Sequence, residues 1–224
     1  MPGALAQGMG IAAAIRALHA QLPATTRLIA VSKTRPAAEV REALAAGQVD
    51  FGENYAQELR DKADEVGPGP VWHFIGGLQR NKVKLVVGRA ALIHDVDTLA
   101  LAEEIGKRSG PVATGILVGV NFGEDQKTGV PVSQVLAFAR ELTAVPGVEL
   151  RGLMAIPPPS EDPEGSAAYF EELRDLAARG RAEGLPLHEL SMGMSHDWRV
   201  AVRYGATLVR VGTAVFGART RKVE

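Results

Sequence analysis

The chain has 224 residues, of which 46% are hydrophobic and 23% are charged, and its formal net charge is −1 at pH 7. This composition is ordinary for a soluble protein with a large core, and the nearly neutral charge gives no reason to expect a nucleic-acid partner. The chain has no cysteine, which excludes disulfides, thiolate metal sites and thiol nucleophiles.

The N-terminal stretch carries no positive charge before Arg16, and no apolar run reaches the length of a membrane span. We therefore expect a cytoplasmic protein without a membrane partner. Residues 4–20 form an alanine-rich amphipathic pattern with Ile11, Ile15 and Leu18 on one face, which predicts a helix before the first strand.

Short apolar runs then alternate with amphipathic segments along the rest of the chain. Strands are predicted at 27–33, 49–52, 71–75, 91–94, 115–120, 148–156, 187–190 and 208–211. Helices are predicted at about 36–46, 53–64, 79–87, 97–108, 132–144, 164–183 and 197–205.

Eight such strand and helix units predict an α/β protein whose parallel sheet closes into a single (β/α)₈ barrel. An open doubly wound sheet is the alternative, although no Gly-x-Gly-x-x-Gly pattern follows the first strand. No segment rich in glycine, serine or charge divides the chain. We therefore expect one domain over 1–224, with residues 1–26 packed on the barrel as an N-terminal helical segment.

Lys33 ends the first predicted strand, directly after an apolar run from Leu28 to Val31 that is typical of a strand buried on both faces. Strand parity places Ile29, Val31 and Lys33 on the same side. A lysine that is partly desolvated at such a position can form a Schiff base. The other interpretation is a surface lysine whose stem covers apolar neighbours.

Two small segments are candidates for phosphate binding. In (β/α)₈ barrels the loops after the seventh and eighth strands commonly hold phosphate, and here they are Ser191-Met-Gly-Met-Ser195 and Gly212-Thr213. Both contain glycine, so backbone N–H groups can approach an anion closely, and Ser191, Ser195 and Thr213 add hydroxyl donors. Each also leads toward a predicted helix N-terminus. Two tight turns with capping serines are the alternative.

Arg210 interrupts the apolar run of the eighth predicted strand. A buried guanidinium keeps its charge and needs an acceptor, such as a ligand's ring nitrogen, carboxylate or phosphate. A structural ion pair or an outward-facing arginine is the alternative. His73 and His94 fall late in their strands, and each can line the same rim or be a hydrogen-bonded core residue, which is the preferred interpretation for His94. No residue cluster has metal-ligand spacing.

Several motifs, in this order, resemble one known family. They are Val31-Ser-Lys-Thr34, Phe51-Gly-Glu-Asn-Tyr55, Trp72-His-Phe-Ile-Gly76 with Gln79 and Asn81-Lys82, Gly152-Leu-Met-Ala-Ile156, Leu190-Ser-Met-Gly-Met-Ser195, and Val209-Arg-Val-Gly-Thr213 with Phe216-Gly217. The set resembles the pyridoxal-phosphate homeostasis protein family and implies a single barrel like the N-terminal domain of alanine racemase. Gly77 and Arg80 depart from the family pattern at the rim.

The resemblance implies that Lys33 holds pyridoxal 5′-phosphate as an internal aldimine and that Arg210 contacts the pyridine nitrogen. The other implied contacts are Asn54, His73 and Met154 for the pocket walls, and Ser191, Ser195, Gly212 and Thr213 for the phosphate. It also implies a role in vitamin B6 and amino-acid homeostasis, with pyridoxal phosphate as ligand and with amino acids or apo-enzymes as further candidate partners. We expect a monomer.

A pyridoxal-phosphate-dependent amino-acid racemase is the enzymatic alternative. An arginine beside the pyridine nitrogen disfavours its protonation, which weakens the ring as an electron sink without excluding racemisation. A two-base racemase also needs an acid/base group on the opposite face of the ring, for which Tyr55 and Tyr204 are the remaining phenols. A Schiff-base aldolase that uses no cofactor is a third hypothesis.

Overall fold

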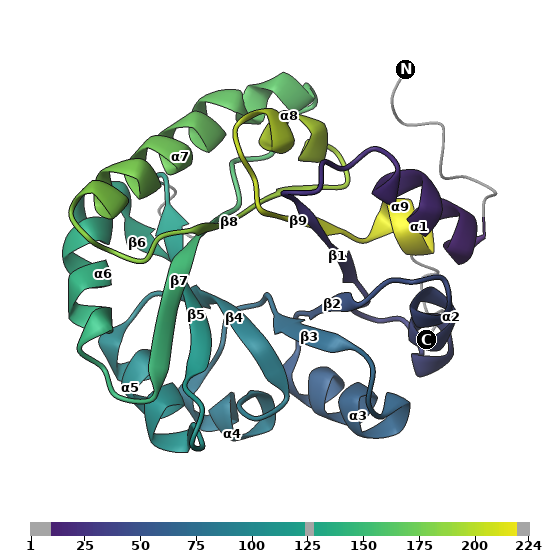
Figure 1. Ribbon diagram of the computed structural model, residues 1–224, viewed down its shortest axis with the longest axis horizontal. Helices are drawn as coiled ribbons and strands as arrows, with labels where there is room; N and C mark the ends of the chain where they lie inside the picture. Colours follow the sequence, from purple (N-terminus) through teal and green to yellow (C-terminus); the bar gives the residue numbers. More distant parts are fainter. Residues whose placement is uncertain (1–9, 124–127, 219–224) are drawn as a thin grey trace.

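Eight parallel strands close into a barrel with helices on its outside (Figure 1), in a computed structural model that describes residues 10–123 and 128–218. The strands are β1 (Arg27–Val31), β2 (Asp50–Glu53), β3 (Val71–Phe74), β4 (Ala90–Val96), β5 (Thr114–Asn121), β6 (Val130–Pro131), β7 (Val148–Ala155), β8 (Glu189–Met194) and β9 (Leu208–Val211). The α-helices are α1 (Ile11–His19), α2 (Ala37–Ala45), α3 (Ala56–Val66), α4 (Val83–Val86), α5 (Leu99–Arg108), α6 (Val135–Thr143), α7 (Ala167–Ala182), α8 (Trp198–Arg203) and α9 (Thr213–Phe216).

The hydrogen-bonded strand order shows that the barrel is closed. It runs β4-β3-β2-β1-β9-β8-β7-β5, and β4 also pairs with β5, so the two ends of the series meet. The two-residue β6 adds to β5 at the rim. Every pairing is parallel, which confirms the predicted (β/α)₈ barrel and excludes the open doubly wound sheet.

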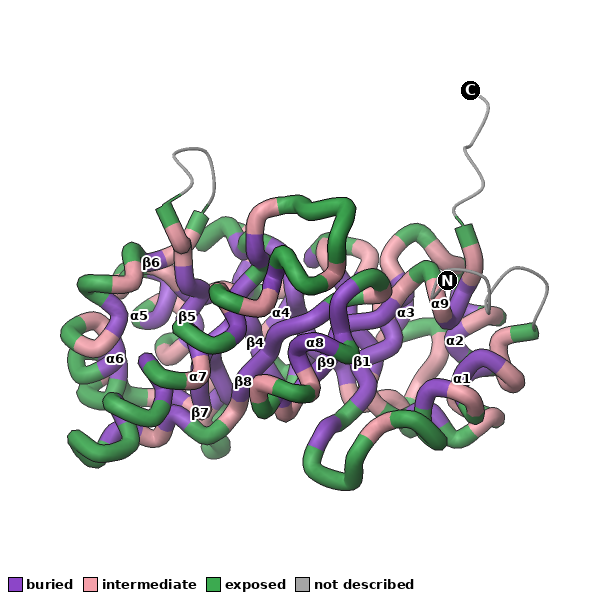
Figure 2. The backbone as a smooth tube through the Cα atoms, turned by 90° about the horizontal axis from the view of Figure 1, so that it is seen from above, coloured by how far each residue is buried: buried purple, intermediate pink, exposed green. Residues whose placement is uncertain are grey.

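The hydrophobic core has two parts. The larger part lies between the barrel and its helices, and in Figure 2 the strands are accordingly mostly buried, whereas the outer helices and loops are largely exposed or intermediate. The smaller part fills the barrel itself and consists of Ile29, Leu92, Leu117, Met154 and Leu208. In β1 the residues Leu28, Ile29 and Ala30 are all buried, because one face of the strand meets the helices and the other meets the barrel interior.

The predicted N-terminal helix is present as α1, which contacts α2 and α9 through a face that includes Ile15 and Leu18. The first part of that predicted helix, residues 4–9, lies outside the described residues. Within the described part of the chain, no helix combines the length and the hydropathy that crossing a bilayer requires.

Two predicted boundaries that bear on the site were wrong. The first strand was expected to reach residue 33, but β1 ends at Val31. Residues 191–194 were expected to form a loop after a strand at 187–190, but they belong to β8. Small residues at this point suggested a turn, whereas Gly193 has φ 89° and lies against α8, where an added Cβ would be 2.6 Å from the Cβ of Ala201. The glycine therefore serves close strand-to-helix packing and an irregular register with β9, not a strand end.

Candidate functional site

A cavity of about 310 Å³ opens at the carboxyl ends of the barrel strands. Six of the sequence-predicted site residues line it: Lys33, Asn54, Ser195, Arg210, Gly212 and Thr213. Lys33 follows β1, Asn54 follows β2, and Arg210 lies on β9, which pairs with β1 so that Arg210 is next to Ile29. Lys33 lies in the turn after β1, which ends at Val31, so the strand parity that assumed a strand through residue 33 does not apply to it, although Lys33 lines the cavity at the barrel mouth.

Lys33 is held in place through the residue before it. The Ser32 hydroxyl donates a hydrogen bond to Glu53 Oε1 over 2.6 Å, and Lys62 Nζ donates both to the Ser32 carbonyl and, over 2.7 Å, to the same Glu53 oxygen. Glu53 is fully buried, and burial raises its pKa to about 6 although the charge of Lys62 acts in the opposite direction. The buried ion pair therefore fixes the end of β1 to β2 and α3.

The residue after Lys33 is fixed in an unusual backbone conformation. Thr34 has φ 63°, which β-branched residues rarely adopt, and its N–H donates to Glu58 Oε1 over 2.6 Å. Glu58 also accepts from Lys62, so one lysine organises the contacts on both sides of Lys33. Such a strained residue is typical of a functional site, where the surrounding structure holds the geometry.

Arg210 lies on the barrel-interior side of the same cavity and is almost completely buried. Its guanidinium donates to Ser191 Oγ over 2.6 Å and to the carbonyl of Ala155 over 2.9 Å, which uses two of its five donors. Burial lowers the pKa of Arg210 to about 10, while Asp197 and Asp95 act in the opposite direction, so the side chain stays cationic at neutral pH.

Hydroxyl groups and a backbone N–H form another part of the cavity wall. Ser195 Oγ accepts a hydrogen bond from the Gly212 N–H over 3.2 Å, and Thr213 follows directly. The α9 helix that begins there has only four residues, so the expected contribution of a helix dipole is small. His196 also lines the cavity, and its Nε2 donates to the carbonyl of Glu161.

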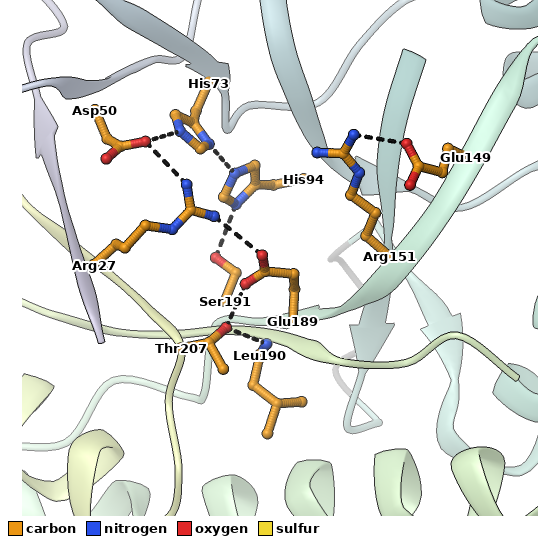
Figure 3. Close-up of polar contacts among 10 residues, drawn as sticks. All are labelled: Arg27, Asp50, His73, His94, Glu149, Arg151, Glu189, Leu190, Ser191 and Thr207. Atoms are coloured by element: carbon orange, nitrogen blue, oxygen red, sulfur yellow. Dashed lines mark hydrogen bonds and ion pairs between the residues drawn. The ribbon is translucent and has the colours of Figure 1, made fainter. Parts of the chain in front are cut away.

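A chain of hydrogen bonds runs inside the barrel from Ser191, the residue that Arg210 contacts, to Asp50 near the amino-terminal end of β2, and Figure 3 shows it from Ser191 onward. Ser191 Oγ lies 2.8 Å from His94 Nδ1, His94 Nε2 lies 2.9 Å from His73 Nδ1, and His73 Nε2 lies 2.9 Å from Asp50 Oδ1. An ionised Asp50 can only accept a hydrogen bond, and each neutral histidine has one donor and one acceptor nitrogen. The hydrogen bonds of the chain can then point in one direction only: Ser191 donates to His94, His94 to His73, and His73 to Asp50.

Three of the residues predicted to contact the ligand do not line the cavity that contains Lys33. His73 and Ser191 lie in this buried chain and are not among the residues that line the cavity, so neither gains support as a direct ligand contact. Their neighbour His94 is fully buried and hydrogen-bonded, which is the core position preferred for it over the rim on sequence grounds. Met154 belongs to the barrel-interior cluster and lines a second, adjoining cavity.

Sequence reasoning missed several residues of this site. Glu53 and Lys62 are nine positions apart on different elements, and their pairing depends on the angle between β2 and α3. His196 carried a usable signal, because it directly follows the predicted phosphate residue Ser195.

The donor set of the cavity fits an anionic aromatic aldehyde. It offers a lysine amine, an arginine that stays cationic, and the hydroxyls of Ser195 and Thr213. Asn54 Oδ1 is buried on the wall without a hydrogen-bond partner among the described residues, which leaves an acceptor for a ligand. No cluster of metal-ligating side chains occurs in the described ranges, 10–123 and 128–218.

Comparisons with known proteins agree with this chemistry. The family model for the alanine racemase N-terminal domain matches residues 10–220. The pyridoxal phosphate homeostasis protein of Pseudomonas aeruginosa is 44% identical over 201 residues, covering 88% of this chain and 86% of the relative, and that of Aquifex aeolicus is 41% identical over 198 residues, covering 86% and 87%.

Solved structures include one that is similar in both sequence and fold and one that is similar in fold alone. PipY of Synechococcus elongatus, with pyridoxal phosphate bound, has a TM-score of 0.86 and 41% identity, covering 92% of this chain and 100% of PipY. Alanine racemase of Corynebacterium glutamicum has a TM-score of 0.77 at 18% identity, covering 96% of this chain and 63% of the racemase, a likeness that concerns the fold alone.

Proposed function

We propose that this chain, which belongs to the pyridoxal phosphate homeostasis protein family, holds pyridoxal 5′-phosphate in its barrel mouth and acts in vitamin B6 and amino-acid homeostasis. The observation that carries the proposal is the single cavity that contains Lys33, Arg210, Ser195 and Thr213. Lys33 comes from the first strand and helix unit and the other three side chains come from the last two units, and together they suit the aldehyde, the ring nitrogen and the phosphate of one ligand.

Lys33 is the covalent anchor in this proposal. Its amine attacks the aldehyde carbon of the cofactor, and loss of one water molecule leaves a Schiff base between Nζ and that carbon. The contacts of Ser32 and Thr34 support this role, because they fix the backbone on both sides of the lysine and so limit the positions that its amine can reach.

Arg210 is proposed to donate to the pyridine nitrogen. The Ser191 and Ala155 contacts orient its guanidinium, and its positive charge keeps a proton off the nitrogen. The bound cofactor supplies an electrophilic carbon and a ring that can accept electrons, and an unprotonated ring accepts them poorly. The arrangement therefore favours holding the cofactor over turning substrates over.

The phosphate is proposed to lie against Ser195, Gly212 and Thr213. The hydroxyls of Ser195 and Thr213 are suitable donors, and the hydrogen bond from the Gly212 N–H to Ser195 Oγ brings the two segments together. Amino acids and apo-enzymes are the proposed further partners, because both present amines that can react with the cofactor aldehyde. A cytoplasmic location and a monomeric state remain predictions of the sequence.

The test is the visible absorption of purified protein after saturation with pyridoxal phosphate and removal of the excess. Wild type and the control Lys84→Ala, which removes an exposed lysine of α4, are expected to retain the absorption band of the lysine-bound cofactor. Lys33→Ala is expected to lose it. An unchanged band in Lys33→Ala would show that another amine binds the cofactor, and a wild type that retains no cofactor would refute the proposed function.

A further inference from the structure

A second cavity, of about 260 Å³, adjoins the first at the barrel mouth. The two share Asn54, Ile75 and Ile156 in their walls, so a ligand in one lies next to the other. Most of the second cavity is apolar, with walls that include Phe122 and Met154. Polar groups gather on its far side, where Asp95 and Thr128 lie, and nothing in the proposed binding of the cofactor uses them.

A β-bulge directs Asp95 into this cavity. The β4 and β5 register pairs Ile93 with Ile116 and then Val96 with Val118, so two residues of β4 lie opposite one residue of β5. The bulge turns Asp95 to the barrel interior, on the same side as its neighbour His94.

A glycine on the facing strand makes room for the carboxylate. Gly119 of β5 lies directly under Asp95, and a Cβ at that position would be 1.9 Å from Asp95 Oδ1. The bulge in β4 and the glycine in β5 together place an acidic group on the wall of this mostly apolar cavity.

The charge of this cavity defines what it can accept. Asp95 Oδ2 accepts a hydrogen bond from the Thr128 hydroxyl over 3.2 Å. Burial and the nearby Asp97 raise the pKa of Asp95, so a bound cation would be a favourable neighbour. Asn54 Oδ1, at the wall shared with the first cavity, is a further buried acceptor without a partner among the described residues.

We propose that the second cavity binds the side chain of an α-amino acid that ends in an ammonium group, with Asp95 as its acceptor. This inference rests on the proposed function, because it places the amino group of the same molecule beside the cofactor in the first cavity. An aliphatic stem fits the apolar walls, and the terminal ammonium meets the carboxylate. A side chain that ends in a carboxylate meets like charge instead.

The test compares ligands that differ in one group. Isothermal titration calorimetry on cofactor-loaded protein measures the Kd of ornithine against norvaline and of lysine against norleucine, pairs in which only the terminal ammonium differs, with glutamate as the opposite charge. Cofactor occupancy is read from absorbance before each titration. In wild type, at least one basic amino acid is expected to bind about tenfold more tightly than its apolar partner, a difference of about 1.4 kcal/mol, and glutamate is expected to bind most weakly.

Variants identify the group that makes the distinction. Asp95→Asn is expected to reduce the preference to less than about threefold while leaving norvaline or norleucine unchanged. Asp97→Asn is the matched control, because it removes a neighbouring charge outside the cavity wall while keeping an acceptor for the Gly129 N–H, and it is expected to retain the preference.

Equal affinities within both pairs in wild type would overturn the inference, and that comparison needs no variant to fold. A preference that survives Asp95→Asn would overturn it as well. If the protein is fully occupied by cofactor in either case, the proposed function is not contradicted. Protein that holds no cofactor would contradict both the proposed function and this inference.

Discussion

His94 is fully buried between His73 and Ser191, and a proton added to its Nδ1 would remove the acceptor of the hydrogen bond that Ser191 donates. Its Nδ1 accepts from the Ser191 hydroxyl, whose oxygen in turn accepts from Arg210. Burial lowers the pKa of His94 well below 6.5, and the charge of Arg210 acts in the same direction. We predict that this histidine makes the fold sensitive to acid.

The sign and the size follow from proton linkage. In the unfolded chain His94 titrates near pH 6.5, whereas in the folded protein it stays neutral to lower pH, so the unfolded state binds more protons below about pH 6.5. Stability is therefore lost as pH falls through this window. Between pH 8 and pH 5 the loss is about 2 kcal/mol, provided that the folded pKa lies below 5.

The assay is urea unfolding at several pH values from 8 to 5, followed by the fluorescence of Trp72 and Trp198, which are both buried. The variant is His94→Gln, whose amide can accept from Ser191 and donate to His73 but does not titrate. Imperfect packing of the amide is expected to cost about 1–3 kcal/mol at pH 8. Its stability should then fall by about 2 kcal/mol less than that of wild type on going to pH 5.

The other titrating groups contribute equally to wild type and His94→Gln, so their effects cancel when the two pH-dependent losses of stability are subtracted. Glu53 has a folded pKa raised to about 6, so its contribution to stability is present at low pH and is lost as pH rises through that value, in both proteins alike. His188→Gln, which changes an exposed histidine, is the control and should follow wild type. If His94→Gln loses as much stability as wild type between pH 8 and pH 5, His94 is not held neutral and the directed hydrogen-bond chain is wrong.

Three further outcomes are expected. Lys62→Met should cost about 3–5 kcal/mol of unfolding free energy because it leaves the buried Glu53 carboxylate unpaired, and adding Glu53→Gln should recover part of the loss in the same denaturation assay; an additive double variant would show that the two side chains are independent. Ser195→Ala should weaken retention of pyridoxal phosphate about fivefold, measured by equilibrium dialysis, for loss of one hydrogen bond, and unchanged affinity would place the phosphate elsewhere. Racemisation of alanine, followed by polarimetry, should stay at background because neither Tyr55 nor Tyr204 lines the cavity, and turnover at enzyme-like rates would contradict this.

The barrel and the position of Lys33 were predictable because they depend on local patterns. Continuous apolar runs such as Leu28 to Val31 are typical of strands covered on both faces, and the alternation of eight of them with helical segments leaves few topologies. Arg210 was informative for a similar reason, since a charge inside such a run needs a partner. The apolar runs and the interrupting charge do not depend on the strand boundaries, whereas the parity prediction for Lys33 does, because β1 ends at Val31.

The interior of the site depends on tertiary geometry that no local pattern encodes. Ser191 looked like a loop hydroxyl, but β8 continues through it and turns its oxygen toward His94 and Arg210. The bulge that redirects Asp95 is defined by pairing with β5, a strand about twenty residues away. The Glu53 and Lys62 pair likewise forms only after α3 docks on the barrel.

The most direct measurement of the central proposal is borohydride reduction of cofactor-loaded protein, followed by tryptic digestion and mass spectrometry. A reduced adduct on Lys33 blocks cleavage there, and the Arg35–Pro36 bond resists trypsin, so the modified peptide should run from Leu28 to Arg41. The proposal predicts that this peptide carries the reduced cofactor in proportion to occupancy. An adduct found mainly on another lysine, or bound cofactor that borohydride does not fix to the chain, would contradict it.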